Sequence, residues 1–97
     1  MITKGRPDPA QKGRVAYALE GREFLVRHFV VRTTTPDNPF VPHRHEQEEI
    51  WFIVEGRGLF VDESGEHAVE AGDLITIDSG RLHGLRAENM VRWICAG

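Results

Sequence analysis

The segment from Pro42 to Gly58, PHRHEQEEIWFIVEGRG, constrains the fold of this chain more than any other. It carries two histidines two residues apart, a carboxylate at Glu49 and then the apolar run IWFIV. On an extended chain successive side chains point to opposite faces, so His43, His45 and Glu49 would share one face. The β-branched and aromatic run has the composition of a strand buried on both faces. The segment therefore predicts a strand that begins beside two imidazoles and a carboxylate, which is most of a metal site.

A second segment, Gly72 to Gly84, has the sequence GDLITIDSGRLHG. Its strand-like LITI is followed by a polar turn and then by His83. A β-barrel brings strands that are distant in the sequence side by side. We therefore expect His83 to approach His43 and His45 and to supply a fourth ligand.

The two segments resemble the two motifs of the cupin family, GxxxxxHxHxxxExxxxxxG and GxxxxxPxGxxHxxxN. The positions that match are His43, His45, Glu49 and Gly56 in the first motif, and Gly72, Gly80 and His83 in the second. Three positions depart from the pattern, because Asp37, Asp78 and Ala87 stand where the motifs have glycine, proline and asparagine. None of these departures removes a metal ligand. Fifteen residues, 57–71, separate the motifs, which is the compact spacing of short bacterial members of the family.

The resemblance implies an all-β, single-domain cupin-type barrel, a double-stranded β-helix or jelly roll. It also implies that His43, His45, Glu49 and His83 bind one divalent transition metal. Three imidazoles and a carboxylate suit Fe, Mn, Ni, Co, Cu or Zn, and the sequence does not choose among them. The alternative is that Glu49 pairs with a nearby arginine, Arg44 or Arg57, and that the histidines line an apolar pocket.

Several residues are candidates for a substrate pocket beside this site. Trp51 and Ile53 follow Glu49 on its own side of the strand. By the resemblance, the strand before the first motif and the final strand also contribute. These add Arg27, Trp93 and Cys95 to the candidates.

Arg27 lies in the apolar sequence FLVRHFVVR and needs an anionic partner there. That partner is either a substrate carboxylate or an acid such as Glu20 or Glu23, or one from a second copy of the chain. His28 has the opposite parity, so we expect it to be a core or interface histidine and not a ligand.

The remaining chain fits an arm at residues 1–13 followed by a barrel domain at residues 14–97. The arm contains two prolines and several charges. Strands are expected at 14–20, 24–32, 82–86 and 90–95, with a turn-rich connection at 33–40 and a hairpin formed by 58–62 and 66–70.

Composition restricts the partners and the location. Twelve basic and fifteen acidic residues are interspersed and leave a net charge of −3, so no nucleic-acid footprint is expected. The single cysteine excludes an intrachain disulfide and favours a reducing compartment. We find no signal-peptide pattern and no apolar run near the ~20 residues that span a bilayer, so we expect a cytoplasmic protein without membrane contact. A barrel this small gains from burying more surface, so we expect a homodimer.

Two functions follow from the resemblance. The first is a metal-dependent enzyme that acts on a small carboxylate- or enol-bearing molecule, of the dioxygenase, isomerase, lyase or decarboxylase type. The second is a non-catalytic metal or small-ligand binding protein or sensor. An open metal face beside a pocket would favour the enzyme, whereas a pocket filled by Trp51 and Trp93 would favour the binding protein. A third reading is an interaction barrel whose site is vestigial.

Overall fold

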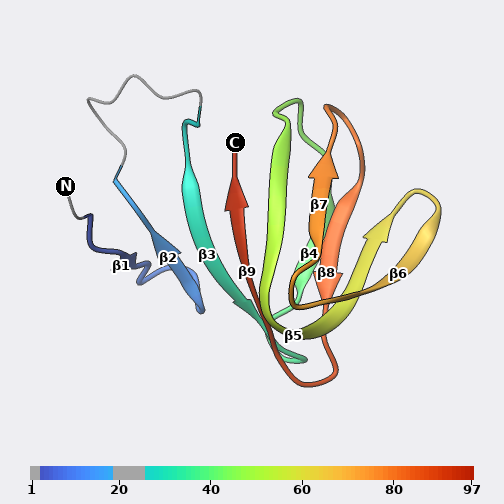
Figure 1. The fold of residues 1–97 in the computed structure, drawn as a ribbon, viewed down its shortest axis with the longest axis horizontal. Helices are drawn as coiled ribbons and strands as arrows, with labels where there is room; N and C mark the ends of the chain where they lie inside the picture. The colour runs from blue at the N-terminus through green and yellow to red at the C-terminus, as the bar shows by residue number, and fades with distance from the viewer. Residues whose placement is uncertain (1–2, 19–25) are drawn as a thin grey trace.

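The computed structural model describes residues 3–18 and 26–97, and in this part every regular element is a β-strand (Figure 1). The strands are β1 (Arg6–Pro7), β2 (Arg14–Ala16), β3 (Phe29–Thr34), β4 (Phe40–His43), β5 (Glu49–Asp62), β6 (Gly65–Glu70), β7 (Leu74–Ile77), β8 (His83–Arg86) and β9 (Val91–Ala96). The predicted all-β fold is confirmed. Among the described residues no helix has the length and apolar character that crossing a bilayer requires.

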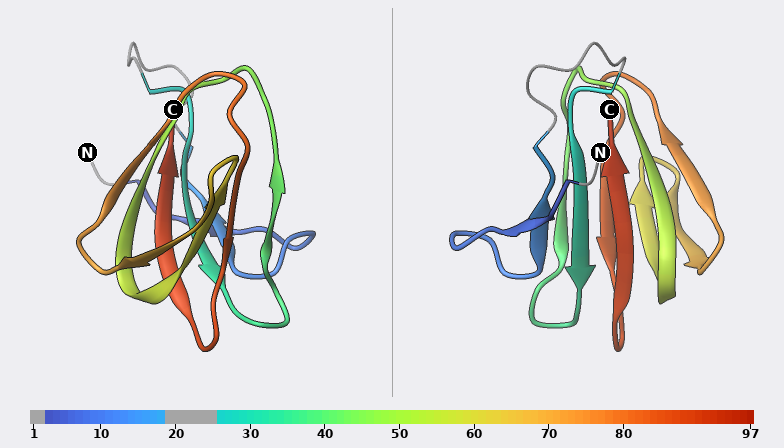
Figure 2. Two further views of the ribbon diagram at one scale, coloured as in Figure 1. Left: turned by 90° about the vertical axis from the view of Figure 1, so that its right-hand side faces the viewer. Right: turned by 60° about the vertical axis from the view of Figure 1, so that its left-hand side comes forward.

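The strands pair antiparallel in the order β1-β2-β3-β9-β5-β8-β4, with β6 and β7 also paired to β5. The sheet curls, so that β4 and β8 lie across from β5 and β9 in the left-hand view of Figure 2. This curling closes the barrel and brings the two motifs together.

The long strand β5 connects the two halves of the barrel. Its first part pairs with β7 and β9, and its second part pairs with β6 and β8. The strand bends between these parts at Gly56, where φ is +83° and the register with β9 has just shifted. A Cβ at Gly56 would collide with the carbonyl oxygen of Met90. Only glycine combines this φ with this close approach, which accounts for the motif glycine.

The core lies inside the curled sheet and is centred on two tryptophans. Trp51 on β5 and Trp93 on β9 are both 0% exposed, and their ring centroids are 4.2 Å apart. Phe40 and Phe60 pack edge-on against Trp51, with centroids 5.3 and 5.6 Å away. Aromatic pairs at such distances add stability beyond the area that they bury.

The apolar run of β5 alternates between this core and the outer surface. Trp51 and Ile53 are fully buried, whereas Ile50, Phe52 and Val54 are 47%, 41% and 44% exposed. The prediction that the run is buried on both faces is therefore wrong within one chain. A single curled sheet covers only its inner face, and nothing within the described chain covers the outer one.

Several predicted elements differ in their bounds. The hairpin at 58–62 and 66–70 is confirmed by the pairing of β5 with β6. The arm at 1–13 contains β1, which pairs with β2. The strand expected at 24–32 is β3, which begins at Phe29 and runs on to Thr34. Residues 19–25 lie outside the described part, and they include Glu20 and Glu23, the acids suggested for Arg27.

Candidate metal centre

Three histidines from the two motifs meet at one end of the barrel. His43 ends β4 and His83 begins β8, and the pairing of these strands sets the two residues opposite each other. His45 lies in the connection to β5. One ring nitrogen of each residue lies within 4.8 Å of the other two, and the Nε2 atoms of His45 and His83 are 3.0 Å apart. The structure thus brings together side chains that are about 40 residues apart in the sequence, as barrel closure requires.

Two of the three imidazoles are held in a defined tautomer. Nδ1 of His43 donates to the carbonyl of Val41 at 3.0 Å, and Nδ1 of His83 donates to that of Arg81 at 2.7 Å. A carbonyl can only accept, so both protons lie on Nδ1 and both Nε2 atoms present lone pairs. This orientation is the usual one for imidazoles that ligate a metal. Nδ1 of His45 is buried and has no hydrogen-bond partner among the described residues.

Glu49 turns inward toward the histidines. Its side chain is 11% exposed, and Oε1 lies 3.4 Å from Nε2 of His45 and 3.9 Å from Nε2 of His83. Oε1 also accepts a hydrogen bond from Nε1 of Trp51 at 3.2 Å. The alternative pairing with Arg44 does not occur, because Arg44 pairs with Glu63.

The Glu49 carboxyl is held ionised. Burial raises its pKa, but hydrogen bonds from Cys95 and Trp51, together with the charges of nearby histidines, outweigh burial and lower the pKa overall. A carboxylate that is already deprotonated needs no proton loss before it can bind a cation.

The spacing of these donors fits a transition-metal ion. Ligands about 2.1 Å from a cation lie about 3.0 Å apart in an octahedral shell and about 3.4 Å apart in a tetrahedral one. The distances of 3.0 Å from His45 to His83 and 3.4 Å from His45 to Glu49 match these values, and the distance of 3.9 Å from His83 to Glu49 is longer by about half an ångström. His83 is fully buried, whereas His43 is exposed and His45 is partly exposed. The cluster is therefore open to solvent on the side of His43 and His45.

The buried imidazole of His83 predicts a loss of stability in acid. Burial lowers the pKa of His83; its hydrogen bond to Arg81 opposes this effect, and the neighbouring His43 and His45 add to it. The unfolded chain therefore takes up a proton near the ordinary value of 6.5, and the folded chain does so only at lower pH. The contribution of neutral His83 to the free energy of unfolding is fully present above about pH 6.5 and decreases as the pH falls below that value. We expect the melting temperature of metal-free protein to decrease from about pH 7.5 to about pH 5.5.

The measurement is a thermal melt followed by circular dichroism in chelator-treated buffer. Asp37, Asp62 and Glu63 have pKa values of about 2 and do not titrate in this range. A His83→Gln variant should show a flatter dependence on pH. A melting temperature that stays constant or rises toward acid in the unmodified protein would contradict the expectation.

The remaining pocket candidates lie in the core beneath the histidines. Trp51, Ile53 and Trp93 are 0% exposed and Cys95 is 5% exposed. The ring centroid of Trp51 is 5.6 Å from that of His83, so the tryptophans fill the interior next to the cluster. Their role in binding a substrate stays a prediction. A ligand would reach the cluster from its solvent side and not through the barrel.

The side assigned to Arg27 and His28 is reversed in the structure. Val30 pairs with Cys95 across β3 and β9, and both are buried. His28 shares the parity of Val30 and faces inward, where its Nε2 is 3.1 Å from Oε2 of Glu49. Arg27 is exposed. Sequence reasoning missed His28 because FLVRHFVVR is apolar on both parities. The sequence therefore does not indicate which set of alternating side chains faces the core.

Of the two arginines near the start of β3, Arg32 and not Arg27 lies against the aromatic core of the barrel. Its guanidinium carbon lies 4.8 Å from the ring centroid of Phe40 and 6.0 Å from that of Trp93. Nη1 donates to Gln11 at 3.2 Å, and the buried Nε has no hydrogen-bond partner among residues 3–18 and 26–97. Burial and the neighbouring Arg14 lower the pKa of Arg32. The sequence did not single out this residue, because only the structure shows that Val30, and with it Arg32, faces inward.

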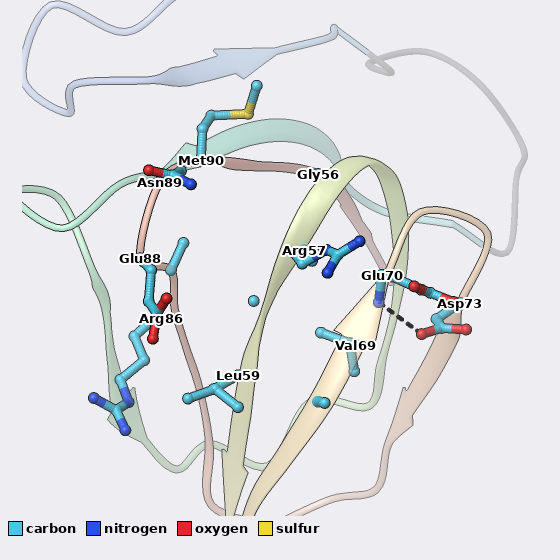
Figure 3. A pocket seen from close by; sticks show the side chains of 13 residues that line it. Gly56, Arg57, Leu59, Val69, Glu70, Asp73, Arg86, Glu88, Asn89 and Met90 are labelled. Carbon is cyan, nitrogen blue, oxygen red and sulfur yellow. Dashed lines mark hydrogen bonds between the residues drawn. The ribbon is translucent and has the colours of Figure 1, made fainter.

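A separate hollow of about 920 Å³ lies at the bend of β5, and it contains none of the predicted ligands (Figure 3). It is bordered by β5, β6 and the connection from β8 to β9. Its charged side chains are Arg57, Glu70, Asp73, Arg86 and Glu88. The mixture of signs does not favour a particular ligand.

Comparisons with known proteins place this geometry in context. A family model described as "Cupin domain" matches residues 29–97. The chain is 36% identical over 77 residues to an acireductone dioxygenase of Synechococcus sp., covering 61% of this chain and 41% of that protein. It is 41% identical over 79 residues to an oxalate-binding protein of Thermotoga maritima, covering 76% of this chain and 65% of that protein. It thus spans less than two thirds of either relative.

A solved structure shares the whole fold. The crystal structure of a predicted oxalate decarboxylase from Thermotoga maritima superposes with a TM-score of 0.75 over 99% of this chain and 96% of that one, at 22% identity. At this identity the likeness shows the fold alone.

Proposed function

This chain belongs to the cupin family, and on that premise we propose that its three clustered histidines and Glu49 hold one divalent transition metal and bind a small anionic molecule. The observation that carries the proposal is the convergence of one ring nitrogen from each of three histidines, with Glu49 Oε1 beside two of them, on a solvent-open side of the barrel. The donor set suits Fe, Mn, Ni, Co, Cu or Zn. Such a cation would act as a Lewis acid or lower the pKa of bound water.

The chain's own residues favour an anionic ligand with two adjacent oxygens. Four protein ligands leave two positions of a six-coordinate ion for a chelate. Arg32 adds a positive charge beside Phe40 and Trp93, and its Nε has no hydrogen-bond partner within the part of the chain that the structure describes. Two relatives are named for such molecules, acireductone and oxalate. We therefore propose a carboxylate or an enediol as the ligand, and chemistry of the dioxygenase type, with decarboxylase, isomerase and lyase reactions as further candidates.

A non-catalytic binding protein is the second candidate. It is favoured by the filled interior, because Trp51 and Trp93 occupy the space beneath the histidines. A relative named as an oxalate-binding protein is consistent with it. In this case the ligand would cap the solvent side of the cation and remain unchanged.

The experiment compares turnover with binding. Protein loaded with each metal in turn is mixed with acireductone under oxygen, and separately with oxalate, and oxygen uptake and products are followed. Turnover with a redox metal supports the enzyme, and saturable calorimetric binding without turnover supports the binding protein. If neither compound is turned over and neither shows metal-dependent binding, the proposed ligand class is wrong. The double variant His43→Ala with His45→Ala, which removes two of the proposed ligands, serves as the control.

We also propose that a second copy of the chain covers the outer face of β5 and β7. Ile50, Phe52 and Val54 on β5 and Leu74 on β7 are 41–60% exposed there, and Phe52 and Leu74 are paired across the strands. Adjacent exposed apolar side chains of this size usually mark an interface.

We expect Phe52→Glu to shift the protein from dimer to monomer, because a carboxylate would be buried without a partner. Light scattering after size exclusion measures the mass. Val41→Glu is the matched control, since Val41 is 68% exposed on β4. A monomeric unmodified protein, or a dimer that persists in Phe52→Glu, would contradict this interface.

A further inference from the structure

Glu49 faces a second group of donor atoms on its other side. Oε1 lies 3.4 Å from Nε2 of His45 and 3.9 Å from Nε2 of His83, and Oε2 lies 3.1 Å from Nε2 of His28. Sγ of Cys95 lies 3.5 Å from the same nitrogen. One donor atom each from His28, Glu49 and Cys95 fall within 4.8 Å of one another.

The backbone fixes this second group as firmly as the first. Cys95 on β9 pairs with Val30 on β3, two residues after His28. His28 also exchanges backbone hydrogen bonds with Gly97, at 2.9 and 3.2 Å. These pairings hold the ends of the two strands together beside the start of β5. The cluster is therefore built by the sheet and not by mobile surface side chains.

The distances match the edges of a metal coordination shell. Bonds of about 2.3 Å to sulfur and about 2.1 Å to nitrogen or oxygen give tetrahedral edges of about 3.6 Å between N and S and about 3.4 Å between N and O. The observed values are 3.5 and 3.1 Å. The two edges that meet at His28 Nε2 thus lie within a few tenths of an ångström of those around a bound cation.

We propose that His28, Glu49 and Cys95 form a second cation site, distinct from the three-histidine centre and joined to it by the Glu49 carboxylate. The sulfur ligand makes this site softer than its neighbour and suits Zn²⁺ or Co²⁺. A bridging carboxylate is common where two cations lie about 3.5–4 Å apart. The inference depends on the proposed function only for the bridge, because the second site has its own ligands.

Binding requires two protons to move, one from the Cys95 thiol, whose pKa burial raises to about 12, and one between the ring nitrogens of His28. The Cys95 thiol releases its proton to solvent when the sulfur binds the cation. Nε2 of His28 must lose its proton while Nδ1 gains one. Gln47 Nε2 now lies 3.0 Å from Nδ1, and rotation of its amide would present the oxygen as an acceptor for the new Nδ1–H.

A cobalt titration tests the second site. Chelator-stripped, reduced protein is titrated with Co²⁺, bound cobalt is counted by elemental analysis, and absorbance is recorded for the sulfur-to-cobalt charge-transfer band. We expect two cobalt ions per chain and a clear band. Cys95→Ser should lose the band and one cobalt ion. His43→Ala with His45→Ala should lose one cobalt ion and keep the band.

The outcomes separate this inference from the proposed function. Saturation with cobalt without a charge-transfer band would overturn the second site. Loss of the band in the His43, His45 variant would also overturn it, because Cys95 would then share a single cation with the histidines. One cobalt ion with a band that survives in that variant would support the second site and contradict the three-histidine centre.

Two further variants protect the test against misfolding. His28→Asn removes a second ligand of the proposed site, so it should reproduce the loss seen in Cys95→Ser if that variant does not fold. His67→Asn is the matched control, because His67 lies on the β5–β6 hairpin and contacts Ser64 and Asp62. It should bind two cobalt ions and show the full band.

Discussion

Replacing His43 and His45 with alanine is expected to abolish metal binding at the three-histidine centre. The two side chains supply half of the proposed ligand set, and His83 and Glu49 alone would leave most of the shell to water. Removing even a partner that only orients a ligand typically lowers metal affinity 10–100-fold, and losing two ligands has a larger effect. We expect metal content to fall from about one equivalent per chain to below about a tenth of one.

The measurement is elemental analysis of protein purified without chelators and without a histidine tag. It is made in a Cys95→Ser background, so that the second proposed site does not contribute. His43 is exposed and His45 is partly exposed, so circular dichroism of the double variant should show an intact fold. His67→Ala on the hairpin controls for adventitious histidine binding. A double variant that keeps a full equivalent would refute the three-histidine centre.

Trp93→Ala is expected to cause a large loss of stability. Trp93 is 0% exposed and packs against Trp51 and Phe40, with ring centroids 4.2 and 5.0 Å away. Its Nε1 also donates at 3.0 Å to the hydroxyl of Thr34, which is buried and would be left without this donor. Removing a buried tryptophan costs about 3–5 kcal/mol, a large part of the about 5–15 kcal/mol that stabilises a typical domain.

Urea unfolding of metal-free protein measures this loss as a lower midpoint at unchanged slope. Trp93→Phe keeps most of the packing and removes only the hydrogen bond to Thr34, so it should cost about 1–3 kcal/mol. Val41→Ala, at an exposed position, should change stability by no more than about 0.5 kcal/mol. If Trp93→Ala costs under about 1 kcal/mol, the aromatic centre does not have the role that its burial indicates.

Much of the proposed centre was predictable because its signals are local. The spacing of His43, His45 and Glu49 sets their parity on an extended chain, and the glycine at position 56 marks the bend of β5. The approach of His83 required one further assumption, that the chain closes into a barrel. The all-β fold and the β5–β6 hairpin followed from alternation and turn residues in the same way.

The strand before the first motif was not predictable in the same way. Its residues are apolar on both parities, so either Arg27 or His28 could face inward, and only the pairing of Val30 with Cys95 settles the phase. The outer face of β5 is a similar case. The sequence shows two apolar faces but does not say that the second lies outside the folded chain.

By itself the sequence determined which donor atoms are available and how those within one strand are arranged, because side-chain alternation is a property of the extended backbone. Only the tertiary structure decided that His28 and Cys95 meet the far oxygen of Glu49 and that two tryptophans fill the space below His83. These relations depend on register between strands that are distant in the sequence. A shift of one residue would reverse every side chain of a strand, and no local pattern records that choice.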